Sequence, residues 1–293
     1  MFAILGDTMS RCILGAMSTR EDYPAGVPCW VDTHQPDPAA AARFYRGLFG
    51  WDTEDTMPPD APGHYLMARL DGRDAAAISS PPPGAPATAE WNTYIRVDSA
   101  DDAAARVRNA GGQVLGEPFD VFDAGRMGVF ADPEGAVFCV WQPGAHKGAA
   151  AVNEHGAVNF NNLHTDDVPA AKAFYSAVFG WTTLEEGMPA WTLPGYGDHL
   201  ETLNPGLRAG MKEMGAPAHF EDVVATIMPR DGGPARWSVT FAVDDADAAA
   251  AKARELGGTI LAEPHDAPWV RRSVLADPAG ASFIASQFVP ENR

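Results

Sequence analysis

The amino-acid sequence predicts an α+β protein built from four strand–helix–strand–strand–strand units in two tandem modules. Three observations lead to this fold class: a chain of 293 residues, a long internal repeat, and the same order of local patterns in each half of each copy. At about 150 residues per domain, the length allows two ordinary domains, each large enough to bury a core.

The internal repeat is the most informative of these observations. Residues 30–51 and 160–181 are identical at 9 of 22 positions when the chain is shifted by 130 residues. Residues 93–118 and 239–264 are identical at 13 of 26 positions at a shift of 146 residues. The two shifts differ by 16 residues, so the second copy carries an insertion. We assign it to the segment 204–233, which is rich in Gly, Pro and Met and is expected to be a loop.

Each half of a copy follows one plan. In the first half, a short strand leads to Asp37 as a helix N-cap with Pro38 at the first helical position, and Gly50 ends the helix. In the second half, a strand precedes a helix that is capped by Asp98 or Ser99, stops at a Gly-Gly pair and is followed by three strands. We therefore expect a disordered extension over residues 1–26, module 1 over 27–143, a linker over 144–156 and module 2 over 157–290.

Charge and cysteine content narrow the range of partners. The net charge of −18 repels phosphate backbones and anionic lipid, so we expect neither a nucleic-acid nor a membrane partner. No stretch approaches the roughly 18 apolar residues of a membrane span. The three cysteines, Cys12, Cys29 and Cys139, show no CxxC spacing, which favours a cytoplasmic protein without disulfides.

The repeated motifs identify a family. The sequence FYxxxFGW closes the first helix of each copy, VD opens the second helix, and DPxG precedes the last strand. Together they resemble the vicinal oxygen chelate superfamily, which includes glyoxalase I, bleomycin-resistance proteins and extradiol dioxygenases. The chain is most similar to two-module members labelled glyoxalase-like or hydroxylase. The resemblance implies that paired units form concave mixed sheets, or bowls, that hold a ligand.

The resemblance also indicates where a divalent metal would bind. In metal-dependent members, three of the ligand positions fall on Trp30, Asn92 and Cys139 in the first copy and on Phe160, Ser238 and Ile284 in the second. Hard divalent ions need several oxygen or imidazole ligands, which these residues do not supply. We therefore expect no metal and no other cofactor, and keep a divalent metal as the alternative.

Side chains alternate across a strand, so the same positions predict the lining of the two bowls. In the first bowl the inward positions include Trp30, Asp32, His34, Asn92, Tyr94, Arg96, Cys139 and Trp141. In the second bowl they include Phe160, Asn162, His164 and Ser238. The first bowl carries more charged and aromatic groups, and we expect it to be the working site.

Two interpretations of the first bowl remain open. Asp32 and His34 are candidates for an acid/base pair, with Arg96 holding a ligand oxygen. Alternatively, His34 closes the turn between strand and helix, since His164 recurs where Asp32 has become Asn162. Arg126 and Arg271, which also recur, are expected to form surface ion pairs.

Three functions follow from these interpretations. The first is a bleomycin-resistance-like module that binds a small organic molecule without metal. The second is an enzyme of the lyase, isomerase or hydroxylase type acting on a small carbonyl or aromatic metabolite, and the third is a metal-dependent glyoxalase or dioxygenase. Four units in one chain complete both bowls, so we expect a monomer or a loose homodimer.

Overall fold

The computed structural model describes residues 20–82, 84, 87–184 and 189–292, and its strands form two eight-stranded sheets. The extension at residues 1–19 lies outside the described residues. The strand order is β2-β3-β4-β1-β5-β8-β7-β6 in one sheet and β10-β11-β12-β9-β13-β16-β15-β14 in the other. The equivalent strands of the two copies occupy the same places, so the predicted α+β class with four repeated units is confirmed.

The first copy contains the units β1–α2–β2–β3–β4 and β5–α3–β6–β7–β8. Their bounds are β1 Pro28–His34, α2 Pro38–Phe49, β2 Asp52–Asp55, β3 Tyr65–Leu70, β4 Arg73–Ser79, β5 Glu90–Arg96, α3 Ala100–Asn109, β6 Gln113–Val121, β7 Gly125–Ala131 and β8 Val137–Pro143. Asp37 caps α2 by accepting a hydrogen bond from the Ala40 amide at 2.9 Å, as expected, and Ser99 caps α3. Gly50 ends α2 with φ of 77°, in the left-handed region that favours glycine.

The second copy repeats this order with one elaboration. Its bounds are β9 Val158–His164, α4 Val168–Phe179, β10 Thr182–Thr183, β11 Ala190–Thr192, α5 Tyr196–Leu203, α6 Leu207–Met214, η1 Phe220–Asp222, β12 Val223–Met228, β13 Arg236–Ala242, α7 Ala246–Glu255, β14 Thr259–Ala267, β15 Val270–Ala276 and β16 Ser282–Phe288. No helix among the residues described is long and apolar enough to cross a membrane.

The expectation of a loop over residues 204–233 is wrong. The segment contains α6, η1 and β12, and α5 lies just before it. The glycines that suggested a loop instead flank α6, because Gly206 and Gly215 have φ of 94° and 80° and occupy its two caps. Leu207 is buried, which gives this short helix an apolar anchor.

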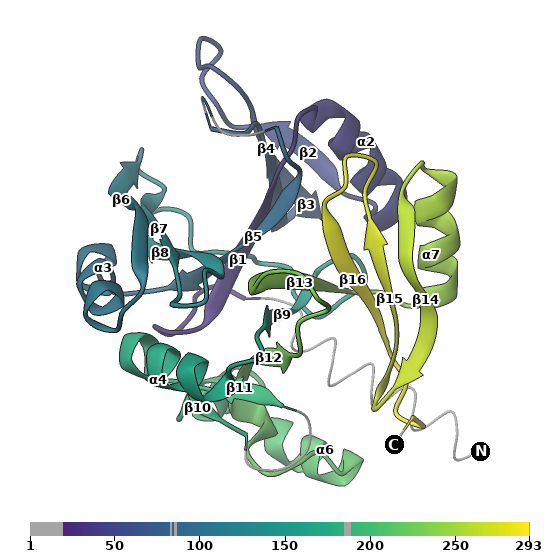
Figure 1. The fold of residues 1–293 in the computed structure, drawn as a ribbon. Helices are drawn as coiled ribbons and strands as arrows, with labels where there is room; N and C mark the ends of the chain where they lie inside the picture. The colour runs from purple at the N-terminus through teal and green to yellow at the C-terminus, as the bar shows by residue number, and fades with distance from the viewer. Residues whose placement is uncertain (1–19, 83, 85–86, 185–188, 293) are drawn as a thin grey trace. The chain divides into compact units, whose positions relative to one another are not determined.

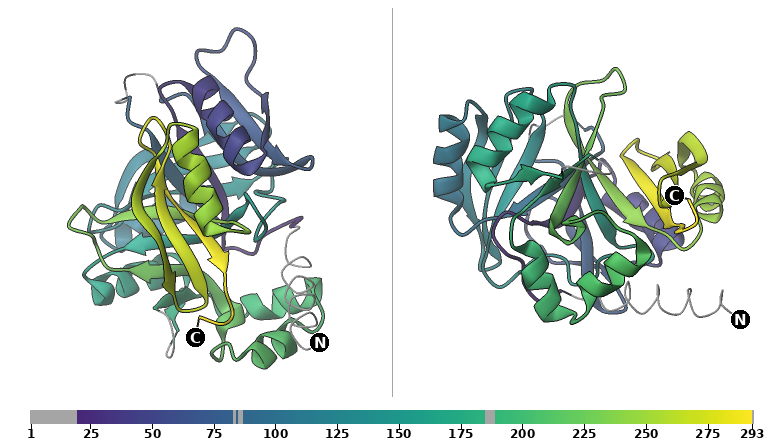
Figure 2. Two further views of the ribbon diagram at one scale, coloured as in Figure 1. Left: turned by 90° about the vertical axis from the view of Figure 1, so that its right-hand side faces the viewer. Right: turned by 90° about the horizontal axis from the view of Figure 1, so that it is seen from below.

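The chain folds into two compact units, and each takes elements from both sequence copies. Of the described residues, unit 1 comprises 20–29, 93–148 and those within 160–237, and unit 2 comprises those within 30–92, 149–159 and 238–292. In unit 1, helix α3 contacts α4, and in unit 2, helix α2 contacts α7 (Figure 1). Helix α7 also lies along β14–β16, as the left view of Figure 2 shows. Packing therefore joins one half of each copy within each unit.

The aromatic residues of the FYxxxFGW motif form the core of each unit, as expected. In unit 2, Tyr45 and Trp51 are fully buried, their rings stack at a centroid distance of 5.2 Å, and Phe241 packs against Trp51. In unit 1, the Tyr175 and Trp181 rings stack at 5.3 Å. These rings bury large apolar areas and account for much of the stability of each unit.

Each unit is also tied by a buried hydrogen bond from a tyrosine to an aspartate of a DPxG turn. The Tyr45 hydroxyl donates to Asp277 at 3.0 Å in unit 2, and the Tyr175 hydroxyl donates to Asp132 at 3.0 Å in unit 1. Burial raises the pKa of both tyrosines, so both hydroxyls remain protonated donors. In each pair, a residue of one sequence copy binds a residue of the other.

A second pair of hydrogen bonds also links the two sequence copies within each unit. Trp51 Nε1 donates to the Gly156 carbonyl at 2.8 Å in unit 2. Trp181 Nε1 donates to the Gly26 carbonyl at 2.7 Å in unit 1. Gly26 and the buried Tyr23 fall within the segment 1–26, so its last residues pack into unit 1. Because both copies carry the same motifs in the same order, each copy contributes the same kinds of hydrogen bond to the unit that it shares with the other copy.

We expect the two tyrosine hydroxyls to differ in their contribution to stability. Tyr175→Phe removes the hydroxyl that donates to Asp132. It also removes the acceptor of Trp237 Nε1, which lies 3.0 Å from that hydroxyl. We expect these two losses to lower the free energy of unfolding by about 2–3 kcal/mol. Tyr45→Phe should cost only about 1 kcal/mol, because Gln35 still donates to Asp277 at 2.6 Å. Urea unfolding of both variants measures the difference. An equal or larger loss for Tyr45→Phe would contradict this account.

Candidate functional site

A hydrogen-bonded cluster in unit 2 contains three of the predicted ligand-binding or catalytic residues. Trp30 and Asp32 lie two residues apart on β1, and Asn92 lies on β5. Asn92 Nδ2 donates to Asp32 Oδ1 at 2.8 Å. Tyr65 on β3 donates its hydroxyl to Asp32 Oδ2 at 3.4 Å and accepts from Trp30 Nε1 at 3.0 Å. We call these four residues the Asp32 cluster.

Burial makes the hydrogen bonds of this cluster important. Asp32 is 1% exposed and Trp30 is 3% exposed, whereas Tyr65 and Asn92 are half-buried. A buried carboxylate is costly unless donors surround it, and here an amide and a phenol do so. The cluster therefore has a buried acidic centre and two side chains that solvent or a ligand can reach.

Tyr65 was not predicted from the sequence. Alternation along a single strand does not show which strands pair or in which register. In the structure, Ser79 pairs with His34 on one side and with Tyr65 on the other. This register places Tyr65 on β3, across β4 from β1.

His34 and Arg96, the other predicted catalytic residues, have different surroundings. His34 is half-buried at the end of β1, and within the described residues its ring makes no hydrogen bond or ion pair. In unit 1, the Arg96 guanidinium pairs with Asp98, and its backbone bonds to Gly26 and Val27. The structure thus joins Asp32 to Asn92 and Tyr65, and the catalytic roles of His34 and Arg96 stay predictions.

The remaining predicted residues of the first bowl lie on β5 and β8 in unit 1. Tyr94 pairs with Cys139 and Arg96 pairs with Trp141 in the parallel register of these strands. Tyr94, Cys139 and Trp141 are buried. Trp141 Nε1 donates to the His146 carbonyl at 2.9 Å, which fixes the orientation of the indole.

The second copy has a neutral group where the first has Asp32. Asn162 on β9 pairs with Thr226 on β12, and its Oδ1 accepts from the threonine hydroxyl at 2.6 Å. Phe160 is half-buried, and Ser238, in unit 2, is buried. The equivalent position in the second copy therefore carries no carboxylate.

His164 is buried in unit 1, with 6% of its surface exposed. Burial, together with the nearby positive charge of Arg236, lowers the pKa of His164. The imidazole therefore resists protonation in the folded chain.

The residues at the family's metal-binding positions do not fit a divalent metal. Trp30, Asn92 and Cys139 offer an indole, an amide and a buried thiol, so the only oxygen that these positions supply is that of one neutral amide. Strand β4, which pairs with β1, brings Ala77 opposite Asp32 and is apolar from 75 to 78. In the second copy the positions hold Phe160, Ser238 and Ile284. No step of a mechanism can therefore be assigned to a metal held at these places.

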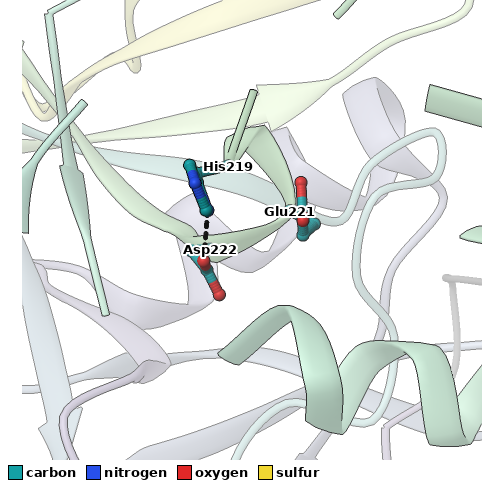
Figure 3. A group of neighbouring side chains, drawn as sticks. All are labelled: His219, Glu221 and Asp222. Atoms are coloured by element: carbon teal, nitrogen blue, oxygen red, sulfur yellow. Dashed lines mark ion pairs between the residues drawn. The ribbon is translucent and has the colours of Figure 1, made fainter. Parts of the chain in front are cut away.

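Another group of potential metal ligands, His219, Glu221 and Asp222, lies around η1 (Figure 3). Asp222 accepts from the Gly197 amide at 2.7 Å and lies 3.5 Å from His219 Nδ1, and Glu221 pairs with Arg208 at 3.0 Å. Figure 3 marks the ion pair between His219 and Asp222, and the potential ligand atoms of all three residues lie within 4.8 Å of one another. These side chains tie η1 to α5 and α6.

Arg126 and Arg271 form surface ion pairs, as expected. Arg126 binds Asp101 and Asp120 in unit 1, and Arg271 binds Asp247 and Asp266 in unit 2. The repetition of these pairs reflects the duplication, and neither arginine belongs to the Asp32 cluster.

Sequence comparison identifies the family of this α+β fold. The profile described as Glyoxalase/Bleomycin resistance protein/Dioxygenase superfamily matches residues 33–140, and the profile described as Glyoxalase-like domain matches residues 158–285. The chain belongs to this superfamily, the vicinal oxygen chelate proteins, as a member with two tandem modules.

Two relatives match over most of their length. The CFP32 protein of Mycobacterium tuberculosis, whose name assigns it provisionally to the glyoxylases, is 43% identical over 94% of this chain and 100% of its own. The anthracycline biosynthesis protein DnrV of Streptomyces peucetius is 37% identical over 89% of this chain and 93% of its own.

Solved structures share the fold. The Mn(II)-bound glyoxalase from Novosphingobium aromaticivorans aligns with a TM-score of 0.57 at 18% identity, covering 90% of this chain and 83% of its own. The 2,2',3-trihydroxybiphenyl 1,2-dioxygenase of Sphingomonas wittichii aligns with a TM-score of 0.55 at 14% identity, covering 91% and 93%. Such low identities show a common fold alone.

The lowered pKa of His164 predicts a pH-dependent stability. The unfolded chain protonates this histidine near pH 6.5, whereas the folded chain does so only at lower pH. The contribution of His164 to the free energy of unfolding is therefore complete above about pH 6.5 and decreases as the pH falls below it. His164→Gln should therefore reduce the loss of unfolding free energy between about pH 7.5 and 5.5. Urea titrations across this range measure the change in slope.

The matched control for this experiment is His265→Gln, at an exposed position on β14. Comparing each variant with the parent chain cancels the groups that titrate in both proteins. An unchanged slope for His164→Gln, or a steeper one, would contradict the assignment.

Proposed function

We propose that this chain binds a small organic molecule at the Asp32 cluster without the divalent metal of its metal-dependent relatives. The observation that carries the proposal is the hydrogen bond from Asn92 Nδ2 to Asp32, because it organises a residue at a family metal position around one buried carboxylate. A metal ion at this place would find one amide oxygen and no imidazole or second carboxylate in the cluster.

The composition of the cluster supports binding of an aromatic ligand. Ligand sites combine apolar and aromatic walls with a few fixed polar groups, and the two half-buried side chains of the cluster, Tyr65 and Asn92, provide one of each kind. The hydrogen bonds to Asp32 and Tyr65 hold these side chains in one arrangement, which lowers the entropic cost of binding. The relative named for anthracycline biosynthesis supports a polycyclic aromatic molecule as the first ligand to test.

A second candidate function is metal-independent catalysis of the lyase, isomerase or hydroxylase type. It is favoured by Asp32, because a carboxylate can accept a proton as a general base and the side chains around it are placed to orient a substrate. The relative whose name assigns it provisionally to the glyoxylases is consistent with an enzyme. Both candidates use the same cluster and differ only in whether the bound molecule reacts.

Metal content tests the proposal directly. Protein purified without chelators should contain well under one equivalent of nickel, zinc, iron or manganese per chain when measured by inductively coupled plasma mass spectrometry. Ligand screening by thermal shift, with aromatic polyketides, glyoxal adducts and glycopeptide antibiotics, should give the same hits before and after chelation. A ligand at about 100 times its Kd stabilises the chain by roughly 2.7 kcal/mol, which such a screen detects. A stoichiometric metal whose removal abolishes binding would contradict the proposal.

Asp32→Asn separates binding from catalysis. We expect the variant to bind the identified ligand at least about 10-fold more weakly, with no turnover in either protein, because Asn92 and Tyr65 lose the charged acceptor that holds them. If the chain is an enzyme, kcat should instead fall by about 100-fold or more. Calorimetry and product analysis by mass spectrometry provide the two measurements. Unchanged affinity and unchanged turnover would exclude Asp32 from either role.

The control for this substitution is Asp247→Asn, which makes the same chemical change at an exposed ion pair of unit 2. His34→Ala, measured in parallel, tests the predicted acid/base partnership, since a joint role with Asp32 would lower turnover in both variants.

A further inference from the structure

The side chains around η1 form a group of potential metal ligands in an insertion that only the second copy has. His219, Glu221 and Asp222 supply one imidazole and two carboxylates, and all three belong to unit 1 (Figure 3). In the second copy α5, α6 and η1 intervene between β11 and β12, whereas in the first copy β3 leads directly to β4. The duplicated fold therefore does not require these contacts.

The carboxylate of Asp222 is the buried member of this group. Asp222 is 8% exposed, and its Oδ1 accepts a hydrogen bond from the Gly197 amide at 2.7 Å. Its Oδ2 lies 3.5 Å from His219 Nδ1 and accepts no hydrogen bond from the residues that the structure describes. Because a buried charge is costly unless it is paired or coordinates a metal, this oxygen favours a cation beside it.

The separation of His219 Nδ1 and Asp222 Oδ2 suits two ligands of one zinc ion. A hydrogen bond between nitrogen and oxygen is about 2.7–3.2 Å long, so 3.5 Å is long for one. Neighbouring ligand atoms of a tetrahedral zinc ion, with bonds of about 2.0–2.2 Å, lie about 3.4 Å apart. The His219 side chain is 78% exposed, so an ion can reach it from solvent.

Glu221 supplies the third potential ligand. Arg208 Nε donates to its Oε1 at 3.0 Å, and within the described part of the chain its Oε2 accepts no hydrogen bond. Gly197 lets α5 approach this carboxylate closely, because a Cβ there would lie 2.2 Å from Glu221 Cγ. In each of the two carboxylates, one oxygen is therefore held by the protein and the other can bind a further partner.

The charges around η1 also favour a cation. Arg208 pairs with Asp198 as well as with Glu221, and Glu201 accepts from the Arg208 amide at 3.0 Å. Together with Asp222, these groups place four carboxylates around one guanidinium. The excess of negative charge attracts a divalent ion.

We propose that His219 Nδ1, the Glu221 carboxylate and Asp222 Oδ2 bind one zinc ion, with water in the fourth position. Imidazole and carboxylate ligands suit zinc, and three protein ligands with one water complete its tetrahedron. Because His219 is exposed and Arg208 competes for Glu221, the ion exchanges with the buffer and is lost during purification, in keeping with the low metal content expected above. The site is separate from the Asp32 cluster of unit 2 and does not depend on the proposed function.

Zinc binding to the full chain without a tag tests this proposal. The protein is dialysed against EDTA and then against metal-free buffer. Isothermal titration calorimetry at about pH 7.5 should then show one saturable zinc site per chain. Calcium should bind at least about 10-fold more weakly, because it prefers oxygen ligands and gains nothing from the imidazole.

Three variants assign the ion to η1. His219→Asn removes the imidazole, and asparagine tolerates the left-handed backbone at φ of 63°, so this variant should fold and weaken zinc binding at least about 10-fold. Glu221→Gln should also weaken zinc binding. Arg208→Gln should tighten it about 2- to 5-fold, because it releases Glu221 from an ion pair of modest strength. A gain in affinity cannot come from a loss of folding.

The matched control is His155→Gln. His155 Nδ1 also lies near a carboxylate, 3.9 Å from Asp244, but among the described residues it belongs to no group of three potential ligands. This variant should bind zinc as the parent chain does. The proposal would be overturned by an absence of saturable zinc binding, by calcium binding as tight as that of zinc, or by a zinc affinity that His219→Asn and Glu221→Gln leave unchanged. None of these results bears on the Asp32 cluster.

Discussion

A buried hydrogen bond from a helix tyrosine to a turn aspartate links the two sequence copies within each unit of this protein. Tyr45 and Asp277 are 232 residues apart, and Tyr175 and Asp132 are 43 apart, yet both pairs have the same 3.0 Å geometry. Each aspartate also accepts from backbone amides of its own turn, so one carboxylate fixes a turn and a helix together. Because the partners come from different sequence copies, neither copy supplies all the contacts of one unit.

Because the core contacts use one face of each strand, the residues on the opposite face can form a binding site. Alternation along β1 sends Val31 and Thr33 to one face and Trp30 and Asp32 to the other. In metal-dependent relatives the second face would supply ligands, whereas here it supports a carboxylate bound by Asn92 and Tyr65. The aromatic core can stay the same while the polarity of the site changes, since the two sets of residues point in opposite directions.

Much of the fold could be predicted because the signals were local or duplicated. The Asp37 cap, the Gly50 helix end and the FYxxxFGW core each depend on residues near in sequence. The helices at 196–214 were missed because their bounding glycines look the same as loop glycines. The candidate site was only half predicted: Trp30, Asp32 and Asn92 follow from strand alternation, but Tyr65 depends on the register of β3, which the sequence did not reveal.

A crystal structure of the protein bound to an aromatic ligand found in the thermal-shift screen, with anomalous data to detect metals, tests the central claim most directly. The account predicts that the ligand contacts Tyr65 and Asn92 and that no metal lies among the residues of the Asp32 cluster. A metal ion coordinated at the Trp30 or Asn92 position, or a ligand bound away from the Asp32 cluster, would contradict it.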